Sequence, residues 1–82
     1  MDKKSFNQKV HILKLCMKIN DNTDFTAGYT LYTYDNSILI YVYKGDLVDK
    51  EVIAKFFVDC DGTYEQAKIW LCNFLADNDN KI

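Results

Sequence analysis

Residues 29–44, YTLYTYDNSILIYVYK, decide the fold of this 82-residue chain. They lie within two runs rich in β-branched and aromatic residues, 25–34 and 38–44, which is the composition typical of β-strands. Between the runs stand Asp35 and Asn36, two residue types that tolerate a positive φ. The pattern therefore predicts a β-hairpin with a two-residue turn.

A two-residue turn places Tyr34 opposite Ser37, and Gly28 opposite Tyr43, whose ring would cover the bare glycine backbone. Side chains alternate between the two faces of a strand. One face of the hairpin is then expected to carry Phe25, Ala27, Tyr29, Leu31, Ile38, Ile40 and Val42. The opposite face is expected to carry Thr26, Thr30, Tyr32, Tyr34, Leu39, Tyr41 and Tyr43.

Residues 51–58, EVIAKFFV, fit two kinds of element. Apolar residues alternate as in a strand, but the segment 49–58 also has an apolar spacing that fits a helix capped by Asp49. The β-branched and aromatic content favours the strand. The second run of the hairpin is apolar on both sides, which suits a central strand with a neighbour on each side.

Helices are predicted at both ends of the chain. Ser5 with Gln8 forms a capping-box pattern, and the apolar spacing that follows predicts a helix to about Ile19. Thr63 with Gln66 forms a second such pattern before a helix that is expected to end near Ala76. Residues 77–82, DNDNKI, read as a frayed tail.

The predicted architecture is α+β, a single small domain over residues 1–82 with the element order α-β-β-β-α. We expect a three-stranded antiparallel sheet with both helices packed on one face. The alternative is a two-stranded hairpin with residues 49–58 helical. The covered face is expected to bear Phe25, Ala27, Leu31, Ile38, Ile40 and Val42.

The charge is unevenly distributed along the chain. Residues 1–20 hold five Lys and one Asp, a net of +4, whereas residues 21–82 hold five Lys and eleven acidic residues, a net of −6. Arginine, the usual residue for bidentate phosphate and base recognition, is absent. The bias to Lys, Asn, Asp, Ile and Tyr is typical of AT-rich coding genomes, including those of phages and mobile elements.

One face of the first predicted helix is basic. At about 100° per residue, its polar side chains fall in a narrow stripe. We define the basic stripe as Lys4, His11, Lys14 and Lys18, with Asn7 among them. Such a stripe is most often the solvated side of an amphipathic helix, and it is also the candidate for contact with phosphate or with an acidic protein.

No pattern in the sequence indicates catalysis, a metal site or a cofactor. Cys16, Cys60 and Cys72 are widely spaced and lie in apolar segments, where cysteine usually acts as a small core residue. An odd number without a C-x-x-C pair suits a reducing, cytoplasmic compartment. His11 is the only histidine, and the DCDG sequence at 59–62 lacks the later ligands of a calcium loop. No signal-peptide or membrane-spanning stretch is expected.

The tyrosines offer the clearest functional signal. If both helices cover one face, the opposite face stays open and carries an apolar patch of partly solvent-exposed tyrosine rings. Cross-strand packing alone also explains such rings. Acidic residues around the sheet would repel a phosphate backbone. We expect a small acidic protein-protein interaction module without catalysis. It could be a phage or mobile-element accessory protein, or an inhibitor of a nucleic-acid-binding host protein such as a component of a defence system, and the same face could form a homodimer. The expected contact residues are Tyr32, Tyr34, Leu39, Tyr41 and Tyr43.

The element order resembles that of the double-stranded RNA-binding domain, and the resemblance is one of topology. That family opens its second helix with a lysine cluster that grips phosphates. The corresponding stretch here is TYEQAKIW, residues 63–70, which contains Glu65 and a single Lys68. RNA binding is therefore not carried over, and nucleic-acid binding through the basic stripe is the alternative function.

Overall fold

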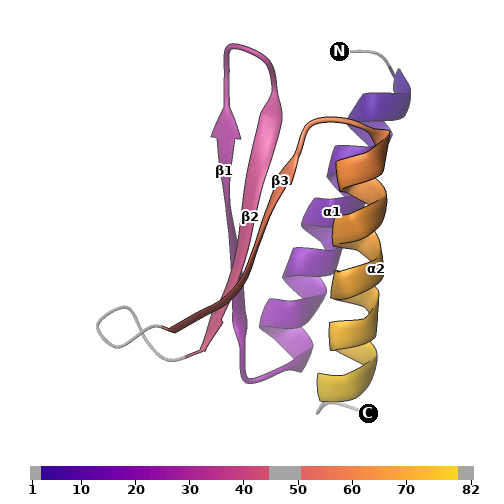
Figure 1. The fold of residues 1–82 in the computed structure, drawn as a ribbon. Helices are drawn as coiled ribbons and strands as arrows, with labels where there is room; N and C mark the ends of the chain where they lie inside the picture. Colours follow the sequence, from indigo (N-terminus) through magenta and orange to yellow (C-terminus); the bar gives the residue numbers. More distant parts are fainter. Residues whose placement is uncertain (1–2, 45–50, 80–82) are drawn as a thin grey trace.

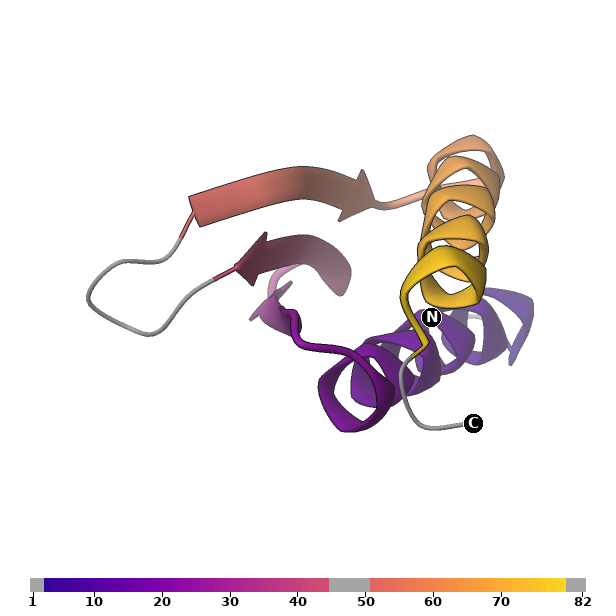
Figure 2. The same cartoon turned by 90° about the horizontal axis from the view of Figure 1, so that it is seen from below.

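The computed structural model describes residues 3–44 and 51–79. The elements follow in the order α1 (Lys3–Asn22), β1 (Thr26–Tyr32), β2 (Ser37–Lys44), β3 (Glu51–Val58) and α2 (Asp61–Asn78). The strands form one antiparallel sheet in the order β1-β2-β3. Both helices lie side by side on the same face of this sheet (Figure 1 and Figure 2). The predicted α+β fold is confirmed, and β3 excludes the helical alternative for residues 51–58.

The turn of the hairpin differs from the prediction. Tyr32, not Tyr34, pairs with Ser37, so the loop has four residues, 33–36. The N–H of Asn36 donates to the carbonyl of Tyr32 at 2.8 Å, with a φ of 59° at Asn36. The carboxylate of Asp35 accepts from the Ser37 N–H at 3.0 Å and from its hydroxyl at 2.7 Å. These bonds close a longer loop than the predicted one.

The register of the hairpin is shifted by two residues as a result. Gly28 lies opposite Tyr41 rather than Tyr43. A shift of two residues equals the period of a strand, so every side chain within β1 and β2 keeps the face that the sequence predicted. A β-bulge in β3 has a different effect: the partner of Val42 is Ala54 but that of Tyr43 is Val52, so Ile53 is the extra residue.

The core lies between the sheet and the two helices. Its buried members from β2 are Ile38, Ile40 and Val42, in the predicted alternation. Leu31 was expected in this covered face but is 48% exposed, because β1 lies at the edge of the sheet. The other buried apolar residues are Ile12, Leu15, Cys16, Ile19, Ala27, Val58, Ala67 and Leu71.

A chain of aromatic contacts ties α2 to both edges of the sheet. Phe25, before β1, meets Phe74 edge-on with ring centroids 4.9 Å apart. Phe74 stacks on Trp70 at 4.9 Å, and Trp70 contacts Phe56 of β3 at 5.3 Å. Aromatic pairs contribute to stability beyond the area that they bury. This series of ring contacts therefore helps to fix the position of α2 on the sheet.

Both helices are longer than predicted. The first begins at Lys3, so Ser5 lies inside its first turn and is not the cap. The second has Cys60 as its N-cap, and the N–H of Cys60 donates to the hydroxyl of Thr63 at 3.0 Å. It continues to Asn78, two residues into the segment predicted as a frayed tail, and residues 80–82 lie outside the described part.

Candidate protein-docking face

The face of the sheet opposite the helices carries side chains from all three strands. Strand pairing places Leu39 beside Phe57, Tyr41 beside Lys55 and Tyr43 beside Val52. No described element packs against this side (Figure 2). We call it the outer sheet face and define it by Tyr32, Leu39, Tyr41, Tyr43, Val52, Lys55 and Phe57.

The tyrosines of the outer sheet face lie against their neighbours. The ring of Tyr41 covers the backbone of Gly28 and stacks on Tyr43 with centroids 6.0 Å apart. Tyr32 contacts Phe57 at 5.8 Å. All three tyrosines are half-buried, as is Leu39. Cross-strand packing therefore accounts for part of the tyrosine content, and this packing holds the rings in fixed positions.

The exposed apolar surface of this face comes from β3. Val52 is 51% exposed and Phe57 is 43% exposed. Leu39, Tyr41, Val52 and Lys55 line a shallow hollow of about 290 Å³. The ammonium of Lys55 and the hydroxyl of Tyr41 are polar groups of this lining that can orient a bound side chain.

Four of the five predicted contact residues lie together on the outer sheet face. The fifth, Tyr34, lies in the loop between β1 and β2 and is 86% exposed. The outer sheet face also includes three residues that were not among the predicted contact residues, Val52, Lys55 and Phe57. Lys55 and Phe57 follow from strand alternation, but Val52 is on this side only because of the bulge at Ile53, which the sequence does not signal.

The basic stripe is not a continuous positive surface. Nζ of Lys4 forms an ion pair with Asp61 at 3.0 Å, and Gln8 Nε2 donates to the other carboxylate oxygen at 2.9 Å. These hydrogen bonds, first that of Gln8 and then that of Lys4, lower the pKa of Asp61. The N-terminal end of the stripe therefore contacts an acidic residue at the start of α2.

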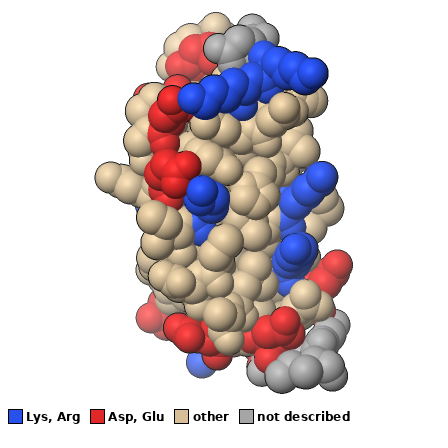
Figure 3. Space-filling model, turned by 90° about the vertical axis from the view of Figure 1, so that its right-hand side faces the viewer, with Lys and Arg blue, Asp and Glu red and all other residues tan. Residues whose placement is uncertain are grey.

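His11 is not a solvated member of the stripe. Its Nδ1 lies 2.8 Å from the hydroxyl of Tyr64, and both side chains are half-buried between the helices. Lys14 and Lys18 are exposed on α1. On the helical side of the molecule, basic side chains are separated by uncharged surface and have acidic neighbours (Figure 3). This arrangement gives weak support to phosphate binding, which needs a concentrated positive field.

The burial of one lysine, Lys9, was not predicted from the sequence. Lys9 is 8% exposed, and its charge acts on Asp35 in the loop of the hairpin. The pKa of Asp35 is lowered mainly by the Ser37 N–H, then by the Ser37 hydroxyl, with Lys9 as a minor cause. Lysine commonly buries its alkyl stem in this way. Asp35 therefore acts in the structure of the loop.

The cysteines differ in their surroundings. Cys16 is buried, and burial raises the pKa of its thiol to about 11. Cys60 and Cys72 were expected in the core but are exposed, because Cys60 caps α2 and Cys72 lies on the outer side of that helix. Among residues 3–44 and 51–79, no cluster of His, Cys, Asp and Glu is suited to hold a metal ion. Neither helix in this part of the chain has the length and apolar character needed to cross a membrane.

Comparison with family models, with curated proteins and with solved structures found no match for this chain.

Proposed function

We propose that this protein is a non-catalytic interaction module that docks on another protein through the outer sheet face. The observation that carries the proposal is the exposure of Val52 and Phe57 beside a hollow lined by Leu39 and Tyr41. Exposed apolar side chains grouped around fixed tyrosine rings are typical of interface cores. Tyrosine is also enriched among the residues that dominate binding energy.

The charge of the chain favours a basic partner. Residues 21–82 carry a net charge of −6 from five Lys and eleven acidic residues. Complementary charge speeds association and suppresses wrong partners. A nucleic-acid-binding protein has a basic surface, so it is the class of partner that complements this negative charge. In such a complex the acidic module would compete with the phosphate backbone of nucleic acid.

The test is capture of a partner by the tagged protein from a bacterial lysate treated with nuclease. The variant Val52→Lys/Phe57→Lys places two charges on the outer sheet face at positions that are already exposed. The matched control is Ile69→Lys, because Ile69 is 56% exposed on α2, on the other side of the molecule. Circular dichroism confirms that each variant is folded.

We expect one protein to be retained by the wild type and by Ile69→Lys, and lost with Val52→Lys/Phe57→Lys. Retention of that protein by all three would contradict docking through the outer sheet face. If material is captured from untreated lysate but not from nuclease-treated lysate, and Lys14→Ala/Lys18→Ala prevents that capture, the protein binds nucleic acid through α1 instead.

A further inference from the structure

The first strand of the sheet has one unpaired edge. Among the described strands β1 pairs only with β2, so half of its backbone N–H and C=O groups point away from the sheet. In an antiparallel ladder these outward groups belong to every second residue. The contacts of Asn20 identify which ones: its Nδ2 donates to the Ala27 carbonyl at 3.1 Å, and its Oδ1 accepts from the Ala27 N–H at 2.7 Å. The next outward groups along β1 therefore belong to Tyr29 and Leu31.

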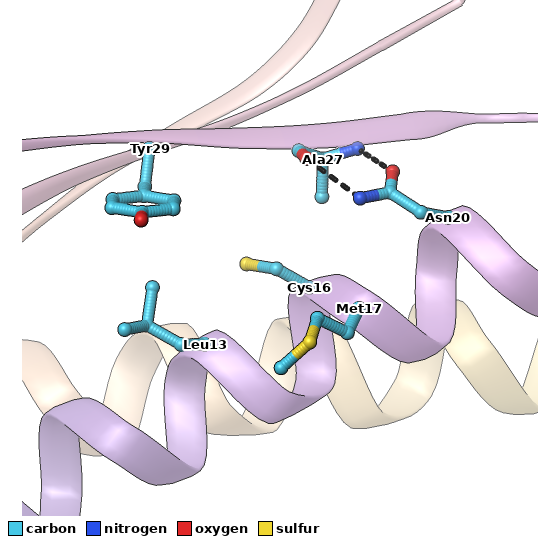
Figure 4. A pocket seen from close by; sticks show the side chains of 6 residues that line it. All are labelled: Leu13, Cys16, Met17, Asn20, Ala27 and Tyr29. Carbon is cyan, nitrogen blue, oxygen red and sulfur yellow. Dashed lines mark hydrogen bonds between the residues drawn. The ribbon is translucent and has the colours of Figure 1, made fainter.

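The side chain of Asn20 hydrogen-bonds both outward backbone groups of Ala27, as a neighbouring strand would. Figure 4 shows this pair of bonds where α1 comes close to β1, and shows Tyr29 facing Leu13 across a pocket. The pocket has a volume of about 180 Å³ and is lined by side chains of α1 and β1. Farther along the strand, the side chains of Tyr29, Thr30 and Leu31 are all exposed.

This free edge lacks the features that usually prevent strands from pairing between molecules. Natural edge strands carry charged residues, proline or a bulge. β3, at the other edge, has Glu51, Lys55 and the bulge at Ile53. β1, with the sequence TAGYTLY, has no charged residue, no proline and no register shift against β2. The two edges of the same sheet are therefore protected unequally.

We propose that β1 pairs with β1 of a second copy of this chain, antiparallel, about a two-fold axis at Thr30. In this register Tyr29 lies opposite Leu31 of the second copy, and Leu31 lies opposite Tyr29 of the second copy. Each of these pairs exchanges both N–H···O bonds, and their apolar side chains meet on one face. Thr30 lies opposite Thr30 of the second copy, and these two residues form a non-hydrogen-bonded pair of the ladder.

The position of Asn20 favours this register and a second copy as the occupant. A register centred on Tyr29 would require the Ala27 groups that Asn20 already binds. The register centred on Thr30 uses only the free groups of Tyr29 and Leu31, and the two-fold axis makes each copy supply what the other lacks. A single strand pair is a small interface, so we expect a reversible dimer. This pairing is independent of docking through the outer sheet face.

Sedimentation across a wide concentration range tests the dimer. We expect the mass to rise from that of one chain to that of two as the concentration increases. Leu31→Lys places a charge on the free edge, which opposes strand pairing between molecules. We expect it to weaken the dimer at least tenfold, which corresponds to about 1.4 kcal/mol. Ile69→Lys, at a similarly exposed site on α2, is the matched control. A single-chain mass at every concentration, or equal effects of both variants, overturns the proposal.

A cysteine at the axis tests the register. In a Cys60→Ser/Cys72→Ser background, Thr30→Cys brings two thiols together, because Cα atoms in such a pair lie about 4.5 Å apart, within the range of a disulfide. Tyr34→Cys, in the exposed loop, is the control. We expect mild oxidation to link Thr30→Cys chains into dimers much faster than Tyr34→Cys chains. Equal rates would refute pairing about Thr30.

Discussion

Tyr41 lies across the backbone of Gly28 so closely that a Cβ on Gly28 would be 2.6 Å from Cε2 of the Tyr41 ring. The two residues are direct partners on neighbouring strands. A glycine inside a strand is ordinarily unfavourable, and here the missing side chain makes room for the ring. The pair fixes the ring of Tyr41 at the centre of the outer sheet face.

The pair predicts the effect of adding one methyl group. Gly28→Ala is expected to destabilise the protein by about 1–3 kcal/mol, because the ring of Tyr41 must move. Urea denaturation measures this change. In a Tyr41→Ser background, the same substitution is expected to be neutral or stabilising, because the clash is gone and alanine restricts the unfolded chain. An equal cost of Gly28→Ala in both backgrounds would contradict the contact.

The contact between the helices predicts a second effect. Tyr64→Phe removes the hydroxyl that lies 2.8 Å from Nδ1 of His11 and keeps the ring. We expect a loss of about 0.5–1.5 kcal/mol, the usual contribution of one hydrogen bond. Tyr34→Phe, at an exposed loop position, is the control and is expected to be neutral. If urea denaturation shows the same stability for Tyr64→Phe and Tyr34→Phe, the hydrogen bond does not contribute to folding.

The carboxylate of Asp61 predicts a pH dependence. Its pKa is lowered from 3.8 by hydrogen bonds from Gln8 and Lys4, so folding favours the ionised form. This stabilisation is complete above 3.8 and is lost as the pH falls through the lower pKa of the folded state. We expect the urea midpoint of Asp61→Asn to lie slightly below that of the wild type near neutral pH. The two midpoints should converge in acid, and a gap that persists in strong acid would contradict the linkage.

The cysteines predict a pattern of reactivity. Cys60 and Cys72 are exposed, whereas Cys16 is buried and its pKa is raised to about 11. A disulfide reagent at mildly alkaline pH is expected to react rapidly with two thiols per chain, because the thiolate is the reactive form. The third thiol should react only when urea unfolds the protein. Rapid reaction of Cys16 in the folded chain, measured with Cys60→Ser/Cys72→Ser, would show that its surroundings are open.

The fold could be predicted from the sequence because strand alternation is insensitive to the length of the turn. The four-residue loop displaced the pairing by two residues, yet Ile38, Ile40 and Val42 still face the helices. The loop itself could not be predicted, since it depends on whether the Asp35 carboxylate bonds to Ser37. Both residues are common in turns of several lengths.

The candidate site was predicted in part for similar physical reasons. Tyr41 and Leu39 lie on the face that their alternation assigns. Val52 joins them because of a bulge, and a bulge reflects the pairing of two strands more than the residues of one. The contact of His11 with Tyr64 joins residues 53 positions apart, which helical periodicity in a single segment does not reveal.

Site-specific photocrosslinking reports which face of the protein touches the partner and leaves the fold intact. A benzophenone amino acid replaces Phe57 on the outer sheet face or Ile69 on α2, both exposed apolar positions. Irradiation in nuclease-treated lysate is expected to give a discrete protein adduct with the probe at 57 and none with the probe at 69. An adduct at 69 without one at 57 would contradict docking through the outer sheet face.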